Sequence, residues 1–203
     1  MKPVVPAHLL QTAVLAAVFA TAAAANDLEP ARIRCDGVGV LEAFRVAYRA
    51  SATLRALVDA IESSDGIVYL ENGRCRSGRL NSCLRLGPVR PGGRYLRITV
   101  DLRLPRATVA GLLAHELQHA IEVLSRADVV DDQSFARLFR EIGIQCDAAG
   151  LGDCWETTRA TAIEQLAAEE MRRYDSAARA AGRDTRPNGR GIPNQSLNRF
   201  REE

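Results

Sequence analysis

Apolar residues recur at helical spacing in four segments of the chain. The expected helices span residues 40–61, 105–124, 131–142 and 155–181. Ser51 can divide the first segment, because a serine side chain caps the start of a new helix. Pro105 is placed to begin the second, since proline lacks a backbone donor that the first helical turn leaves unused. The pattern therefore predicts that helices dominate the core.

Alternation typical of strands occupies the middle of the chain. The expected strands cover residues 67–70, 80–86 and about 94–102. Their connections are short, which predicts an antiparallel three-stranded sheet with its arginines on the solvent face. The expected fold class is α+β, with many helices and one small antiparallel sheet.

The N-terminus has the features of an export signal. Lys2 precedes an apolar run over residues 9–20, and four alanines at 22–25 offer a cleavage site. A retained membrane anchor is the alternative, and the alanine-rich end favours cleavage. No later segment is apolar enough to span a bilayer. We expect a signal peptide over 1–25, one domain over 26–182 and a disordered tail over 183–203. The protein is then periplasmic or secreted, and bacterial.

Composition narrows the classes of partner. The chain has 203 residues and a formal net charge of +2, which argues against a nucleic-acid or anionic membrane partner. Lys2 is the only lysine, so the positive charge is almost entirely arginine, as in proteins from GC-rich bacterial genomes. The sequence says nothing about the oligomeric state.

Five cysteines become informative once export is expected, because disulfides persist in oxidising compartments. Cys75 with Cys83 and Cys146 with Cys154 are each separated by a short loop, so we predict these two local disulfides. Cys35 is then left over, and other connectivities stay open. No Cys-x-x-Cys motif occurs, which excludes a zinc ribbon.

The segment His115-Glu116-Leu117-Gln118-His119 carries the candidate chemistry. Histidines four residues apart lie on one face of a helix, so both imidazoles can reach one metal ion. Glu116 lies beside that face, where its carboxylate can take a proton from water activated by the metal. The chain holds only three histidines, and His8 falls in the predicted signal peptide.

This helix, following a small sheet, resembles the zincin metallopeptidases. The resemblance covers the motif helix, the preceding strand and one downstream glutamate, which is less than half of the chain. It implies a zinc ion, histidine ligands at His115 and His119, and Glu116 as general base. It also implies an edge strand that aligns an extended peptide substrate.

The third ligand must be a carboxylate, as in the gluzincin branch, because the mature chain has no third histidine. We predict Glu156, since it heads an otherwise apolar face of the last predicted helix. That face continues through Ala160, Ile163, Ala167, Met171 and Tyr174. Glu164 is the alternative ligand, on a face that could sit in water. Gluzincins carry a supporting acid where this chain has Ala160.

Two further roles stay open. Glu122 could be a ligand, could accept a hydrogen bond from a ligand, or could be an ordinary solvated carboxylate paired with Arg126; we favour the last. Spacing does not identify the residue that stabilises an oxyanion. The candidates are Tyr69, Tyr95, Tyr174 and Arg159.

The favoured function is a zinc-dependent peptidase acting on a peptide or protein substrate. One alternative is an exported binding or scaffold module with a structural or absent metal. Another is a zinc hydrolase that acts on non-peptide amides.

Overall fold

The computed structural model describes residues 30–76, 80–90, 93–146 and 154–184. The predicted signal peptide lies outside these ranges. So does the predicted tail, apart from residues 183 and 184, which end the last helix.

The helices follow the apolar pattern closely. They are α1 (Val38–Ala50), α2 (Ala52–Glu62), α3 (Arg106–Leu124), α4 (Asp132–Ile142) and α5 (Thr158–Asp184). Ser51 divides the first two, and its side chain accepts a hydrogen bond from the backbone of Leu54, as predicted. Pro105 immediately precedes α3, and Asp131 caps α4. Local capping chemistry thus fixes where these helices begin.

The main sheet is mixed, so the prediction of an antiparallel three-stranded sheet was wrong. Its strands are β1 (Ile33–Cys35), β2 (Gly66–Asn72), β3 (Ser82–Leu86) and β4 (Arg94–Val100), in the order β1-β2-β4-β3. β2 runs parallel to both β1 and β4, and only β3 pairs antiparallel, with β4. A second, two-stranded antiparallel sheet joins β5 (Ile144–Gln145) to β6 (Trp155–Glu156).

The order of the strands explains why the main sheet is mixed. The chain leaves β2, passes beyond the position of β4 to form the edge strand β3, and returns to place β4 between them. β4 therefore sits inside the sheet, where Leu96, Ile98 and Val100 are almost fully buried. β1 was not predicted, because a strand of three residues carries no readable alternation.

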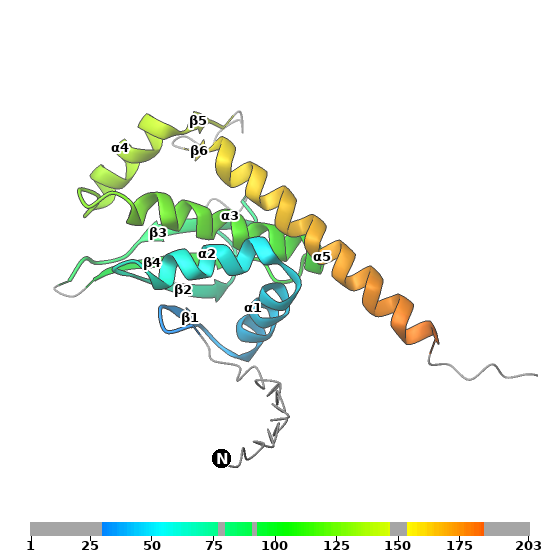
Figure 1. Ribbon diagram of the computed structural model, residues 1–203. Coiled ribbons are helices and arrows are strands. Elements are labelled where there is room, and N and C mark those ends of the chain that lie inside the picture. Colours follow the sequence, from blue (N-terminus) through cyan, green and yellow to red (C-terminus); the bar gives the residue numbers. More distant parts are fainter. Residues whose placement is uncertain (1–29, 77–79, 91–92, 147–153, 185–203) are drawn as a thin grey trace, which may run out of the picture.

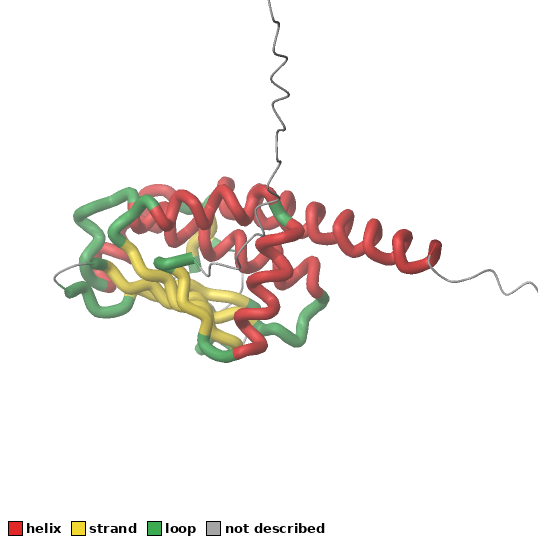
Figure 2. Tube along the Cα trace, turned by 60° about the horizontal axis from the view of Figure 1, so that its bottom comes forward, coloured by secondary structure: helices red, strands yellow, loops and turns green. Residues whose placement is uncertain are grey.

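Helices cover one face of the main sheet, and none of the described helices covers the other, which we call the open face (Figure 2). Along β2, Val68 and Leu70 are buried while Tyr69, between them, is exposed. Arg97 of β4 lies on the open face, as expected for the arginines of the sheet. Arg94 does not: its side chain is buried, because it reaches under the end of α3.

α3 lies at the centre of the molecule, between the sheet and α5 (Figure 1). Most of its side chains are buried, including those of polar residues. α5 packs along α3 with its first half, and its second half continues beyond the body of the domain (Figure 1). None of the helices in the described ranges is long and apolar enough to cross a membrane.

Both predicted disulfides are present, joining Cys75 to Cys83 and Cys146 to Cys154. Cys35 takes part in neither of them. Two disulfides fit a protein that matures in an oxidising environment.

Candidate metal centre

Four polar side chains of α3 lie inside the protein. His115, Glu116 and His119 are between 4% and 7% exposed and Gln118 is 2% exposed, although the other buried residues of α3 are apolar or glycine. Burying two imidazoles and a carboxylate is costly unless each finds a partner. The surroundings of these groups therefore determine what the site can do.

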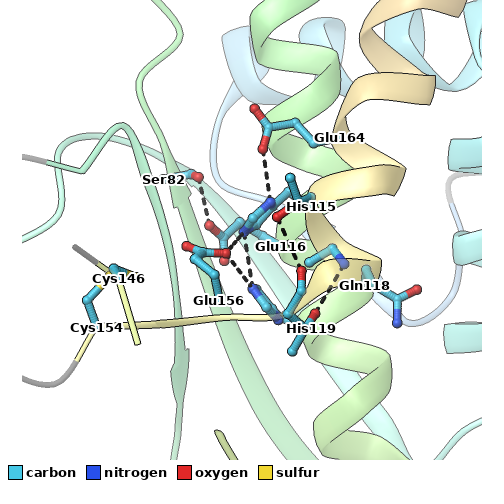
Figure 3. Close-up of polar contacts among 12 residues, drawn as sticks. Ser82, His115, Glu116, Gln118, His119, Cys146, Cys154, Glu156 and Glu164 are labelled. Atoms are coloured by element: carbon cyan, nitrogen blue, oxygen red, sulfur yellow. Dashed lines mark hydrogen bonds and ion pairs between the residues drawn. A yellow bond between two sulfur atoms is a disulfide. The ribbon is translucent and has the colours of Figure 1, made fainter. Parts of the chain in front are cut away.

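The two imidazoles and the carboxylate of Glu156 converge on one point (Figure 3). The Nε2 atoms of His115 and His119 are 3.1 Å apart. Oε2 of Glu156 lies 2.8 Å from Nε2 of His115 and 3.4 Å from Nε2 of His119. The structure thus brings together the three residues that the sequence suggested as metal ligands.

Glu156 reaches the site from a strand, which corrects the prediction that it heads a helix face. It lies in β6, and α5 begins two residues later, at Thr158. Thr157 intervenes, and its side chain accepts a hydrogen bond from the backbone of Ala160 in the first turn of the helix. Thr157 thereby caps the start of the helix, so Glu156 lies before the helix and remains extended.

The apolar face of α5 is buried only along the first half of the helix. Ala160, Ala167 and Met171 are almost fully buried, as expected for the predicted face. Tyr174, at the end of this face, is 40% exposed.

Two more carboxylates hold the outer nitrogens of the imidazoles. Oε2 of Glu122 lies 2.7 Å from Nδ1 of His119. Glu122 also accepts hydrogen bonds from Gln118 and Thr157, and its side chain is only 12% exposed. The expectation of a solvated Glu122 paired with Arg126 was therefore wrong, because α5 covers this side of α3.

Glu164 supports the other imidazole. Its Oε2 lies 3.0 Å from Nδ1 of His115, close enough for an ion pair but without the alignment of a hydrogen bond (Figure 3). The sequence had placed Glu164 as the alternative ligand or on a solvated face. It instead occupies the supporting role that Ala160 cannot fill, because it is one helical turn further along α5.

The close packing of imidazoles and carboxylates shifts the pKa values of these groups. Burial lowers the pKa of His115, but Glu156 and Glu164 outweigh it and raise that pKa to about 10. The pKa of His119 is also raised, since Glu122 and Glu156 outweigh its burial. Burial raises the pKa of Glu156, but the two imidazoles outweigh it and bring the pKa down to about 2. Without a metal, protons therefore balance the carboxylates.

Glu116 stands apart from the other carboxylates because it forms no hydrogen bond or ion pair with either imidazole. The hydroxyl of Ser82, on edge strand β3, donates a hydrogen bond to its Oε1 at 2.7 Å. Burial raises the pKa of Glu116, more than Ser82 and the two imidazoles lower it. Sequence reasoning missed Ser82, since only the pairing of β3 with β4 brings it beside α3.

A cavity of about 180 Å³ opens beside these groups. Ser82, His115, Glu116, His119 and Glu156 form its polar wall. The rest of its lining comes mainly from β3, α4 and β6, and consists of Leu80, Cys83, Leu84, Phe135, Ala136, Phe139, Cys154 and Trp155. None of the four residues suggested as oxyanion stabilisers lines this cavity.

The donor atoms fit a small divalent cation. Around a tetrahedral zinc ion with bonds of 2.0–2.1 Å, ligand atoms lie about 3.3 Å from one another. The three donor atoms here are separated by 2.8 to 3.4 Å. Both Nδ1 atoms are turned towards carboxylates and both Nε2 atoms face the common point, so each ring has a partner for the nitrogen that would not bind the metal. The group could therefore hold a metal ion.

Comparison of the chain with protein-family models, with curated proteins and with solved structures finds no match.

Proposed function

We propose that this protein is a zinc-dependent hydrolase that cleaves peptide bonds. The proposal rests on one observation: His115, His119 and Glu156 converge beside a cavity whose wall also contains the buried carboxylate of Glu116. A metal site used only for structure needs no such carboxylate and no cavity. The resemblance of the α3 sequence to the zincin metallopeptidases supports the same proposal.

Each group has a role in this proposal. Zinc, when bound, supplies Lewis acidity for a substrate carbonyl and for water. Glu116 acts as the general base, because its carboxylate lies beside the cavity and its pKa is raised by burial, which favours taking up a proton and returning it to a leaving group. Ser82 holds Oε1 of Glu116 and leaves its second oxygen for the reacting proton. Glu122 and Glu164 position the imidazoles.

The cavity favours a peptide with an apolar side chain. β3 is the edge strand of the main sheet and lines the cavity with Ser82 and Leu84, so an extended peptide could pair along it. Phe135, Phe139 and Trp155 form an apolar wall. A dry cavity of about 150 Å³ accepts a benzene ring, so one of about 180 Å³ has room for a leucine or phenylalanine side chain.

Export is part of the proposal. The two disulfides support a location outside the cytoplasm, and the N-terminal pattern of charged, apolar and small residues supports a cleaved signal.

The test compares Glu116→Gln with Glu141→Gln. Glu116→Gln keeps the size of the side chain but cannot take up a proton, so bound zinc should remain while peptide cleavage falls about a hundredfold or more. Glu141 lies on the exposed side of α4, and Glu141→Gln should change neither property. Metal content and the cleavage of a mixed peptide library give the two readouts.

Other outcomes would favour the alternatives. A wild-type protein that holds zinc but cleaves no amide is a binding or scaffold module. Cleavage of acylated amino sugars but of no peptide makes it an amide hydrolase. A wild-type protein that stays metal-free in excess zinc refutes the whole proposal.

A further inference from the structure

The hairpin that carries Glu156 is closed by a disulfide. β5 and β6 pair Ile144 with Glu156 and Gln145 with Trp155. The next pair along this ladder is Cys146 and Cys154, whose backbones are joined by a hydrogen bond of 3.0 Å and whose side chains form the disulfide. A ladder of two residues in each strand has little stability of its own. The disulfide therefore helps to hold β6, and with it Glu156, in place.

Glu156 lies between two sets of possible metal ligands (Figure 3). Its carboxylate contacts the imidazoles of His115 and His119. Its carboxylate also lies within 4.8 Å of both sulfur atoms of the Cys146–Cys154 disulfide. Both cysteines are partly exposed, so a reductant in solution can reach them. In the described ranges, the Cys75–Cys83 disulfide has no carboxylate or imidazole grouped with it in this way.

We propose that reduction of the Cys146–Cys154 disulfide creates a second metal site, formed by the two thiolates and the carboxylate of Glu156. In the reduction, a small dithiol gives two electrons and two protons to the protein disulfide and becomes a disulfide itself. Each cysteine thiol then loses its proton when it binds the metal. Thiolates bind zinc and cobalt strongly, so this set can compete with the two imidazoles for Glu156.

The consequence is that the oxidation state of the hairpin decides which donor set Glu156 completes. In the oxidised protein the sulfur atoms are bonded to each other and cannot act as thiolate ligands. Glu156 is then available to His115 and His119, so the hydrolytic site of the proposed function is complete only after the disulfide has formed. This step rests on the proposed function, but the thiolate site itself does not.

Cobalt(II) is the probe, because cobalt bound by thiolates shows a charge-transfer absorption that imidazole and carboxylate ligands do not give. Two variants of the mature chain are reduced with a dithiol, freed from it without oxygen, and titrated. Cys75→Ser/Cys83→Ser keeps the hairpin cysteines, and Cys146→Ser/Cys154→Ser is the matched control. Circular dichroism confirms that both are folded.

We expect the charge-transfer band in the variant that keeps Cys146 and Cys154, with an apparent affinity at least about tenfold above that of the control. Adding Glu156→Gln should lower this affinity about tenfold or more. Equal affinities in the two variants, or no effect of Glu156→Gln, would overturn the proposal.

A second measurement needs no substitution. In reduced wild-type protein, cobalt should protect Cys146 and Cys154 from alkylation more strongly than Cys75 and Cys83, as mapped by mass spectrometry. Uniform protection or none counts against the thiolate site. Failure of the hydrolase proposal is seen separately, as oxidised wild-type protein that binds no cobalt at all.

Discussion

Each imidazole of the candidate metal centre has a carboxylate beside its Nδ1 atom and the common point beside its Nε2 atom. His119 is hydrogen-bonded to Glu122 on one side and faces the common point on the other. His115 faces the same point, and its Nδ1 lies 3.0 Å from Glu164 without the alignment of a hydrogen bond. An imidazole with a fixed partner at Nδ1 cannot rotate freely or exchange its tautomer. Glu122 and Glu164 therefore determine how well the ligands are aligned before a metal arrives.

Glu122→Ala should lower zinc affinity about 10–100-fold, because it removes the partner of His119 Nδ1 and leaves this buried ring loosely oriented. Competition with a chromophoric chelator measures the effect. Glu141→Ala removes the same charge from the exposed side of α4 and should leave zinc affinity unchanged. If the two variants bind zinc equally well, Glu122 has no positioning role.

At this scale the sequence was a good guide to the residues of the motif and a poor guide to their partners. The spacing of His115 and His119 is a property of one helix, so it could be predicted. The contact of Glu122 with His119 is local to α3 and was among the alternatives, although we favoured another. The contacts of Glu164 and Ser82 depend on packing between α3, α5 and β3, which no local pattern encodes. Glu156 was selected from an apolar periodicity, yet it acts from a strand.

Among the elements, α3 is fixed to the sheet by one buried arginine. Arg94, at the start of β4, donates hydrogen bonds to the carbonyl oxygens of Val123 and Leu124, which end α3. It also donates to Arg126 O and forms an ion pair with Asp65. The guanidinium thus satisfies carbonyl groups that the last turn of a helix leaves without partners.

Arg94→Lys should lower the free energy of unfolding by about 2–3 kcal/mol. A lysine ammonium cannot reproduce the planar array of donors, so at least one buried carbonyl loses its charged partner. Urea unfolding followed by circular dichroism measures the loss. Arg97→Lys is the control on the same strand, since Arg97 is half exposed on the open face, and it should change stability by less than about 0.5 kcal/mol. Equal losses of stability in the two variants would show that the hydrogen bonds of Arg94 to the end of α3 contribute nothing.

Gly111 lets α3 and α5 approach each other next to the metal centre. A Cβ atom at this position would lie 3.0 Å from the backbone oxygen of Glu164 and 3.2 Å from Cβ of Ala168. Any side chain here must therefore push α5 away, and Glu164 with it. The close approach of the helices is what brings Glu164 to His115.

Gly111→Ala should lower the free energy of unfolding by about 1 kcal/mol, because overpacking outweighs the better helix propensity of alanine. It should also weaken zinc binding, since Glu164 moves away from His115. Gly39, in α1, has no atom within 4 Å of an added Cβ. Gly39→Ala should therefore stabilise the fold by about 0.4–1 kcal/mol. Thermal melts and zinc titrations of both variants test this; a Gly111→Ala protein as stable as Gly39→Ala contradicts it.

The helices were predictable because their caps and apolar periodicity are local features, as at Ser51 and Asp131. The sheet was not, because the pairing of β2 with β4 depends on the route that the chain takes through β3. The alternation in β4 is compatible with either direction of pairing. Only the position of β4 between β2 and β3 distinguishes parallel from antiparallel pairing with β2.

For the molecule as a whole, the candidate metal centre links stability to pH. The pKa of His115 is raised from 6.5 to about 10 in the folded protein, so its contribution to stability is complete below pH 6.5 and is lost as the pH rises through 10. The pKa of Glu156 is lowered from 4.5 to about 2, so its contribution is complete above pH 4.5 and is lost as the pH falls through 2.

Metal-free protein should therefore gain most from this pair between pH 4.5 and 6.5 and melt at progressively lower temperatures as the pH rises towards 10. Zinc needs imidazoles without protons, so the rise in melting temperature that it causes should be larger at about pH 8 than at about pH 6. Differential scanning calorimetry measures both. His115→Gln should remove the fall in melting temperature at alkaline pH that is attributed to this residue. If zinc raises the melting temperature of the wild-type protein equally at all pH values, the expected exchange of protons for metal is contradicted.

Both disulfides close short loops, with a sequence separation of 8 in each case. A cross-link restricts the unfolded chain in proportion to the logarithm of the loop it closes, which for loops of this size amounts to about 2.5 kcal/mol each. That is a fraction of the 5–15 kcal/mol typical of a whole domain. Each bond restricts only the short segment that it closes, and these two segments border the cavity at β3 and at β6. Opening one of them should therefore loosen the rim of the cavity while the core of α3, α5 and the sheet stays assembled.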